Sequence, residues 1–198
     1  MPHLVPLLIR GINNLSDARY CAGMGADKLT FLLDPSLPGH LNTKTVKELS
    51  GWIAGVELIG EFDTLSTSEI NAIANECALD AVLLRSPRSA AELAEIAPPV
   101  YLEMAADSAA LVQPLPASLQ GVIVELPAQV SVETLAYLQE MATRQSLWLG
   151  PGLLPERARD LVNQFQLAGL SFPSGDEVKP GLRDFDQLEA VFDALEVE

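Results

Sequence analysis

Eight short apolar runs of strand length alternate with stretches of helical character along the whole chain, and this alternation constrains the fold more than any other feature. The runs cover residues 4–9, 26–33, 54–62, 80–84, 99–104, 121–126, 146–149 and 168–172. Amphipathic or capped stretches lie between them and predict helices over residues 16–24, 66–77, 89–96, 131–143, 155–165 and 184–195. Strands that alternate with helices indicate βα units and a parallel sheet.

The number of repeats separates two parallel architectures. Eight βα units suit a closed (β/α)8 barrel, the TIM barrel, which needs at least about 200 residues, and this chain of 198 residues reaches that limit with short loops. A doubly wound open sheet would have fewer strands and a glycine-rich first turn, but residues 10–14 contain no G-x-G-x-x-G pattern. Because no linker divides the sequence, we expect residues 1–198 to form a single α/β barrel domain.

Composition excludes several functional classes. The 27 acidic and 12 basic residues give a formal charge of −15, which repels nucleic acid and anionic lipid. No apolar run approaches the length of about 20 residues that a membrane span needs, and the amino terminus has no basic region typical of a secretory signal. We therefore expect a cytoplasmic monomer or homodimer with no nucleic-acid or membrane partner.

The cysteines, histidines and tryptophans predict no cofactor or metal site. Cys21 and Cys77 are too few for a disulfide framework and fit small core positions inside helices. His3 and His40 have no second ligand nearby in the sequence, so we expect no metal. The two tryptophans, residues 52 and 148, fit packing between helices and the sheet.

Charged side chains occupy the carboxyl ends of the predicted strands: Arg10, Glu61, Arg85, Glu103 and Glu125. These ends converge on one mouth in a (β/α)8 barrel, where its active sites lie. Two arginines that face several carboxylates could hold an anionic ligand, while a carboxylate whose pKa is raised by burial acts as an acid or base. The alternative is a ring of ion pairs that compensates its own charge and keeps the mouth soluble.

Small residues follow the seventh and eighth predicted strands. Gly150 and Gly152 precede a helix, and Ser174 and Gly175 follow the last strand. Loops at these two positions commonly bind phosphate in this fold, because backbone N–H groups there can approach an anion. The alternative is ordinary turn chemistry. We expect the ligand to be a small sugar phosphate or another anionic metabolite.

Several motifs along nearly the whole chain resemble those of the phosphoribosylanthranilate isomerase family. Residues 8–12, followed by Ser16-Asp17-Ala18 and Gly25-Ala26-Asp27, resemble the family's opening strand, its E-D-A helix and its G-A-D segment, and residues 79–84 resemble its strand 4. The segment 149–156 resembles G-G-L-x-P-E-N, and residues 174–177 with 180–184 resemble S-S-G-V-E…P-G-x-K-D. The resemblance implies a (β/α)8 fold and the Amadori rearrangement of N-(5-phosphoribosyl)anthranilate in tryptophan biosynthesis, with an aspartic acid as general acid and a cysteine as general base.

Both catalytic positions of that family carry other residues here: Arg10 stands at the cysteine position and Glu125 at the aspartate position. An arginine cannot serve as a base, because it stays protonated in proteins. One hypothesis is an isomerase with Glu125 as acid, Glu103 or Glu61 as base, and Arg10 or Arg85 holding the anthranilate carboxylate. The other is a divergent barrel that acts as a binding or accessory protein, or on another phosphorylated or anionic metabolite.

Further departures from the family pattern bear on this choice. Gly39 stands where the family has a substrate-binding arginine, Leu8 and Glu103 stand where it has lysines, and Pro151 replaces a glycine of the phosphate loop. The glycine-rich segment that follows strand 6 in the family is missing between Leu126 and Ser131. The altered base and this shortened loop favour the second hypothesis, whereas the serine and glycines after the last two strands keep a sugar phosphate ligand in both.

Overall fold

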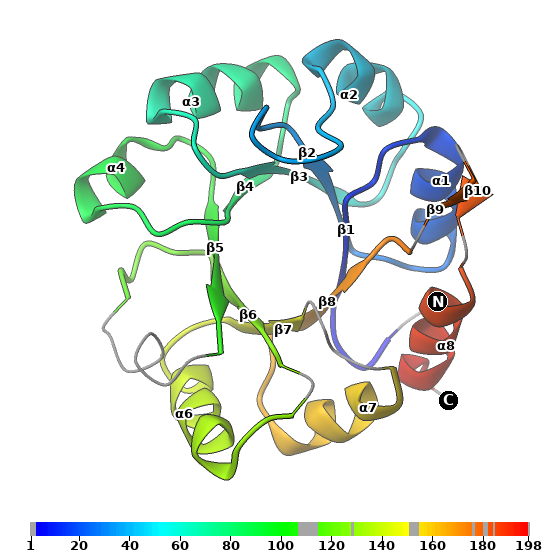
Figure 1. Ribbon diagram of the computed structural model, residues 1–198, viewed down its shortest axis with the longest axis vertical. Coiled ribbons are helices and arrows are strands. Elements are labelled where there is room, and N and C mark those ends of the chain that lie inside the picture. The colour runs from blue at the N-terminus through cyan, green and yellow to red at the C-terminus, as the bar shows by residue number, and fades with distance from the viewer. Residues whose placement is uncertain are drawn as a thin grey trace.

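The computed structural model of this protein describes residues 3–106, 115–127, 129–150, 155–175, 177–179, 182–183 and 185–197. Eight parallel strands close into a barrel in chain order (Figure 1). They are β1 (Leu7–Arg10), β2 (Lys28–Leu32), β3 (Glu57–Phe62), β4 (Ala81–Leu84), β5 (Val100–Ala105), β6 (Gly121–Glu125), β7 (Leu147–Gly150) and β8 (Gly169–Pro173). Pairing of β1 with β8 closes the sheet. The predicted (β/α)8 barrel is confirmed.

Helices surround the barrel (Figure 1). In the described part of the chain they are α1 (Leu15–Gly23), α2 (Thr43–Ser50), α3 (Thr67–Glu76), α4 (Ala90–Glu95), α6 (Val132–Ala142), α7 (Pro155–Gln164) and α8 (Asp186–Leu195). All but α2 were predicted within one or two residues at each end. The sequence pattern missed α2 because only Val46 and Leu49 of its eight residues are buried, so its apolar stripe is short.

Side-chain caps fix where several helices begin. Ser66 accepts a hydrogen bond from the backbone N–H of Glu69, whose carboxylate accepts one from the backbone N–H of Ser66. Ser89 and Glu92 form the same capping box at α4. Each box satisfies two backbone donors that the first helical turn leaves without an intrahelical partner.

The strands separate two apolar cores. One lies between the barrel and the helices, and Cys21 and Cys77 are buried in it, as predicted. The other fills the barrel interior and includes Tyr101 and Trp148, whose rings meet edge to face at 5.9 Å between centroids. Trp148 therefore packs inside the barrel rather than against a helix. The expectation for Trp52 is also wrong: it follows α2 with 67% of its surface exposed, and Arg19 lies over its ring.

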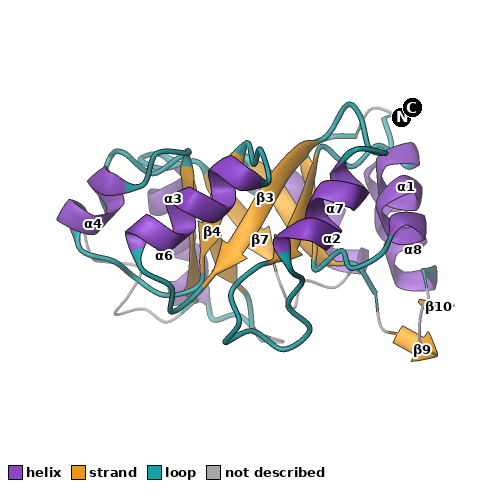
Figure 2. Ribbon diagram, turned by 90° about the horizontal axis from the view of Figure 1, so that it is seen from above, coloured by secondary structure: helices purple, strands orange, loops and turns teal. Residues whose placement is uncertain are grey.

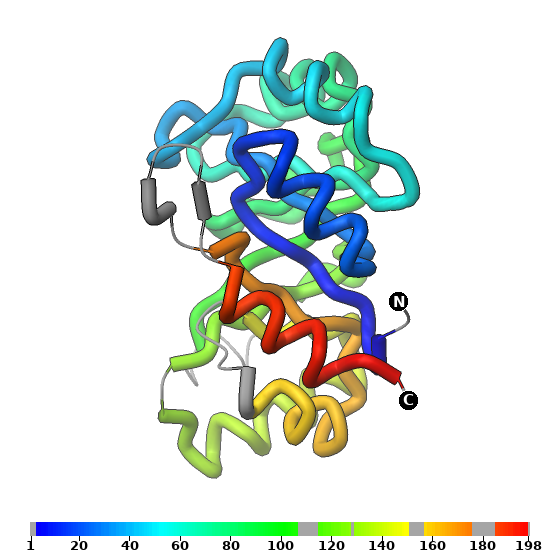
Figure 3. Tube along the Cα trace, turned by 90° about the vertical axis from the view of Figure 1, so that its right-hand side faces the viewer, coloured from blue at the N-terminus to red at the C-terminus, as the bar shows by residue number. Residues whose placement is uncertain are grey.

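Two further features lie at opposite ends of the barrel (Figure 2). β9 (Glu177–Lys179) and β10 (Leu182–Arg183) form a separate antiparallel pair, which the sequence pattern did not predict, beyond the carboxyl end of β8. At the other end, the N–H of Leu4 donates to the carbonyl of Leu195 and brings the chain ends together beside α8 (Figure 3). No helix in the described ranges is long and apolar enough to cross a membrane.

Candidate functional site

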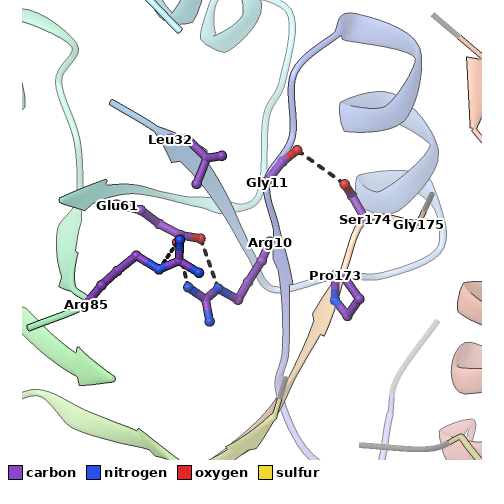
Figure 4. A pocket seen from close by; sticks show the side chains of 8 residues that line it. All are labelled: Arg10, Gly11, Leu32, Glu61, Arg85, Pro173, Ser174 and Gly175. Atoms are coloured by element: carbon purple, nitrogen blue, oxygen red, sulfur yellow. Dashed lines mark hydrogen bonds and ion pairs between the residues drawn. The ribbon is translucent and has the colours of Figure 1, made fainter. Parts of the chain in front are cut away.

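A cavity of about 300 Å³ opens at the carboxyl end of the barrel (Figure 4). It is lined by Arg10, Gly11, Leu32, Glu61, Arg85, Pro173, Ser174 and Gly175. Three of the five charged residues predicted at this mouth therefore line the cavity. Glu103 is hydrogen-bonded to two of them, and Glu125 ends β6 at the same end of the barrel without lining the cavity.

Alternation along the strands places these side chains in the barrel interior. Successive strand residues point to opposite faces, so residues two apart share a face. Arg10 follows the interior residue Leu8 by two positions, Glu61 follows Ile59, and Glu103 follows Tyr101. The apolar residues fill the interior below, and the charged residues form the layer above them, next to the mouth.

Arg10 is held between two carboxylates. Its Nε donates to Oε1 of Glu61 at 2.9 Å, and its Nη2 donates to Oε2 of Glu61 at 2.6 Å. Its Nη1 donates to Oε1 of Glu103 at 2.5 Å, and Nη2 also donates to Oε2 of Glu103 at 3.2 Å. Because the side chains of Arg10 and Glu61 are 7% and 1% exposed, this charge pair lies in the barrel interior.

Thr30 connects the charged layer to the loop after β1. Its hydroxyl donates to Oε1 of Glu61 at 2.5 Å and accepts the backbone N–H of Gly11 at 2.9 Å. Glu61 is thus fully buried with hydrogen bonds to both oxygens. Thr30 was not predicted as a site residue, because a threonine inside an apolar run looks like an ordinary strand residue.

Arg85 is bonded differently. It directly follows β4, its side chain is 36% exposed, and its Nε donates to Oε2 of Glu103 at 3.1 Å. The same Nε lies 3.7 Å from Oε2 of Glu61. Its terminal nitrogens, Nη1 and Nη2, donate no hydrogen bond to any residue that the structure describes. Arg85 therefore keeps hydrogen-bonding capacity at the cavity that its side chain lines (Figure 4).

The network sets the protonation of its members. Burial disfavours the charge of Arg10, but hydrogen bonds and charge from Glu61 and Glu103 outweigh burial and raise the pKa of Arg10 further. Burial likewise opposes the charge of Glu103, but its hydrogen bonds and ion pairs with Arg10 and Arg85 lower the pKa of Glu103 below its usual range. A carboxylate with a lowered pKa is a weak proton acceptor, so these surroundings do not favour the base role predicted for Glu103.

Glu125 has a different environment. It is exposed, and its side chain makes no hydrogen bond or ion pair with the described residues. The register pairs Glu125 with Ala105 and Glu103 with Ile123, so Glu103 lies one layer deeper in the barrel. Glu125 is therefore a carboxylate that is not engaged by the arginine network.

The predicted phosphate site is only partly described. Gly152 lies outside the described residues, together with residues 151, 153 and 154. Gly150 has a packing reason to be glycine, since a Cβ there would lie 2.1 Å from the carbonyl oxygen of Ser171. The N–H of Ser174 donates to the carbonyl of Arg10 at 2.9 Å, and its hydroxyl donates to that of Gly11 at 3.2 Å. Gly175, which follows Ser174, has a φ of 97°.

Asp34 is a buried carboxylate that was not predicted from the sequence pattern. It accepts the backbone N–H groups of Asp63, Thr64 and Leu65 and of Ser36, and so joins the loops after β2 and β3. Burial opposes its charge, but these hydrogen bonds hold the pKa of Asp34 well below its usual range. The Asp-Pro-Ser sequence signals a turn, but nothing in it indicates the partner loop 29 residues away. Within the described ranges, no group of three or more His, Cys, Asp or Glu side chains could hold a metal ion.

Comparisons with known proteins agree with the motifs. No family model matches the chain. The chain is 26% identical over 202 residues to the N-(5'-phosphoribosyl)anthranilate isomerase of Deinococcus radiodurans, covering 96% of each protein. The predicted resemblance to phosphoribosylanthranilate isomerases is confirmed over nearly the whole chain.

Solved structures support the same fold. Phosphoribosyl anthranilate isomerase from Thermotoga maritima superposes with a TM-score of 0.81 at 21% identity, over 96% of this chain and 98% of that one. A phosphoribosyl anthranilate isomerase in complex with reduced 1-(o-carboxyphenylamino)-1-deoxyribulose 5-phosphate has a TM-score of 0.80 at 22% identity, over 96% and 97% of the two chains. At these identities, the structural likeness establishes the (β/α)8 architecture.

Proposed function

We propose that this phosphoribosylanthranilate isomerase-like barrel isomerises N-(5-phosphoribosyl)anthranilate in tryptophan biosynthesis, at the cavity lined by Arg10 and Arg85. The observation that carries the proposal is the combination of surfaces in that cavity. Guanidinium groups, the apolar Leu32 and Pro173, and the small Ser174 and Gly175 lie around one opening. They suit a substrate that joins a carboxylate, an aromatic ring and a phosphorylated sugar. Whole-chain similarity to isomerases supports the same reaction.

Proton transfer is assigned to Glu125. In its acid form, Glu125 gives a proton to the ring oxygen of the ribose, the bond between C1 and that oxygen breaks, and the nitrogen lone pair forms a C1=N bond. The resulting carboxylate then removes the proton from C2. The C2–H electrons form the C1=C2 bond, the C=N electrons return to nitrogen, and the enol relaxes to the ketone. Glu125 is protonated again at the end, so one residue supplies both the acid and the base that the rearrangement requires.

The arginine network is the reason for assigning both steps to one residue. Glu103 receives hydrogen bonds from Arg10 and Arg85, and Glu61 receives two from Arg10 and one from Thr30. Removing a proton from C2 would require either carboxylate to give up bonds to a cation. Arg10 shapes the electrostatic field of the site and takes no proton.

Steady-state kinetics of the purified protein with N-(5-phosphoribosyl)anthranilate test this function. Glu125→Gln is expected to lower kcat/KM by about 10² or more, the usual contribution of a positioned proton-transfer group. The matched control is Glu48→Gln, an exposed carboxylate on α2 that should leave kcat/KM unchanged. The proposal fails if the wild-type protein shows no turnover and does not restore growth of a tryptophan auxotroph lacking the isomerase.

A second function is favoured by one observation, the pairing of Arg10 and Arg85 with Glu61 and Glu103. In this layer the two positive charges balance the two negative charges, and the charged side chains at the site are paired with one another. It suits a barrel that binds a phosphorylated or anionic metabolite without the Amadori step. Tight binding of reduced 1-(o-carboxyphenylamino)-1-deoxyribulose 5-phosphate by calorimetry, with no turnover of N-(5-phosphoribosyl)anthranilate, would establish this alternative.

A further inference from the structure

The two arginines at the mouth differ in how many of their donors are already used. Both Nη atoms and the Nε of Arg10 donate to carboxylates. Arg85 donates only through Nε, to Glu103, and in the described part of the chain its two Nη atoms donate no hydrogen bond. A guanidinium binds a planar oxyanion through two parallel N–H groups, and Arg85 alone of the pair has both terminal nitrogens available for it.

We propose that Arg85 is the carboxylate-binding and specificity-determining residue of this site, and that Glu103 positions it. This inference rests on the proposed function and names which arginine holds the anthranilate carboxylate. Glu103 is itself fixed from the other side by Arg10, which holds both of its oxygens. The bond from Arg85 Nε to Glu103 therefore joins a side chain that is 36% exposed to one that is 10% exposed and immobilised.

The surroundings favour a monoanion on an apolar body. Arg10 and Arg85 are balanced by Glu61 and Glu103, so each ligand charge adds to a layer whose net charge is zero. Because the arginines already offset the buried Glu61 and the half-buried Glu103, a phosphate dianion would add twice the uncompensated negative charge of a single carboxylate. Leu32 and Pro173 line the same cavity and offer apolar contact to a ring. A benzoate-type carboxylate matches both features.

Calorimetric titration of the full-length protein with anthranilate, and separately with inorganic phosphate, tests the inference. Arg85→Lys keeps the positive charge but removes the two parallel N–H donors of the guanidinium. The Kd for anthranilate should therefore rise about tenfold or more, which corresponds to the loss of one charge-assisted hydrogen bond. Glu103→Gln should also raise the Kd for anthranilate, and both variants should change the Kd for phosphate less than twofold. Arg144→Lys, an exposed arginine on the turn after α6 that pairs with Glu140, is the control and should change neither.

The double variant, Arg85→Lys with Glu103→Gln, separates a positioning role of Glu103 from general structural damage. If Glu103 acts through Arg85, then Glu103→Gln adds little further loss of anthranilate affinity in the Arg85→Lys background, and the two effects are non-additive. Additive losses, or equal losses for anthranilate and phosphate, would overturn the positioning role. Unchanged anthranilate affinity in Arg85→Lys, or no anthranilate binding by the wild type, would overturn the carboxylate site.

Turnover of N-(5-phosphoribosyl)anthranilate distinguishes this inference from the proposed function. An active wild type whose KM is unchanged by Arg85→Lys refutes the inference and leaves the isomerase standing. An inactive wild type that binds anthranilate through Arg85 refutes the isomerase and leaves the carboxylate site standing.

Discussion

Arg10 and Glu61 share two parallel hydrogen bonds in the barrel interior, 2.9 Å from Nε to Oε1 and 2.6 Å from Nη2 to Oε2. Glu61 is fully buried, and Arg10 is also held by Glu103. The bonds satisfy charges that would be costly to bury alone. The pair ties β1 to β3, two strands that are not neighbours in the barrel.

Replacing Arg10 should therefore destabilise the fold. Arg10→Met is expected to lower the free energy of unfolding by about 3–5 kcal/mol, because it leaves the fully buried Glu61 with only the longer 3.7 Å ion pair to Arg85. Denaturant titration measures the change. Arg144→Met, which removes an exposed ion pair with Glu140, should cost less than about 1 kcal/mol. Similar losses in the two variants would contradict the importance of the buried pair.

Asp34 predicts part of the acid sensitivity. Its folded-state pKa lies below the unfolded value of about 3.9, so its contribution is complete above that pH and is lost as the pH falls toward the folded-state pKa. Asp34→Asn should lower the free energy of unfolding at pH 7 by roughly 1–3 kcal/mol and should flatten its fall below about pH 4. Urea titrations at several pH values check both effects. This role would be refuted if the free energy of unfolding of Asp34→Asn fell with pH as steeply as that of the wild type and of the control Glu48→Gln.

Gly150 predicts a steric effect that is independent of any ligand. An added Cβ would lie 2.1 Å from the carbonyl oxygen of Ser171 and 2.8 Å from its carbonyl carbon, so β7 or β8 must shift. Gly150→Ala should lower the free energy of unfolding by about 1–3 kcal/mol, as overpacking does. Gly23→Ala, where nothing lies within 4 Å of the added atom, serves as control and should be neutral or slightly stabilising. Equal stability of the two variants would show that the strands adjust freely.

Truncation of the two tryptophans should change stability by very different amounts. Trp148 is 3% exposed inside the barrel, and Trp148→Ala should lower the free energy of unfolding by about 3–5 kcal/mol. Trp52 is 67% exposed, and Trp52→Ala should change it by less than about 1 kcal/mol, the range of an exposed contact with Arg19. Thermal or denaturant unfolding measures both. A large loss in Trp52→Ala would indicate a packing role that its exposure does not suggest.

The sequence predicted the barrel because strand and helix periodicity are local properties. The eight runs match the eight strands, and Ser66 and Ser89 marked two helix starts correctly. Strand order then placed Arg10, Glu61, Arg85 and Glu103 at one mouth. The helix α2 escaped prediction because its apolar stripe is short. The position of Trp148 inside the barrel escaped prediction because it depends on contacts between distant segments.

Pairing at the site could not be predicted in the same way. Composition and spacing do not show that Arg10 lies between Glu61 and Glu103. They also do not show that the N–H of Ser174 donates to the carbonyl of Arg10. These contacts join residues 51, 93 and about 160 positions apart. They decide which carboxylate is free for chemistry, so the residue roles changed once the geometry was known, and Thr30 joined the set of site residues.

The arrangement of Glu61, Arg10 and Glu103 also constrains how the sequence can evolve. A cysteine at position 10, introduced alone, would remove the cation that lies between the buried Glu61 and the half-buried Glu103, so we expect Arg10→Cys with Glu125→Asp to fold poorly. Neutral residues at positions 61 and 103, introduced first, would instead leave Arg10 as a buried charge without an anion. The order of substitutions is therefore restricted, and the effect of each depends on the charges already present. A lineage that acquires this charged layer is held there by its own stability, whichever reaction the mouth supports.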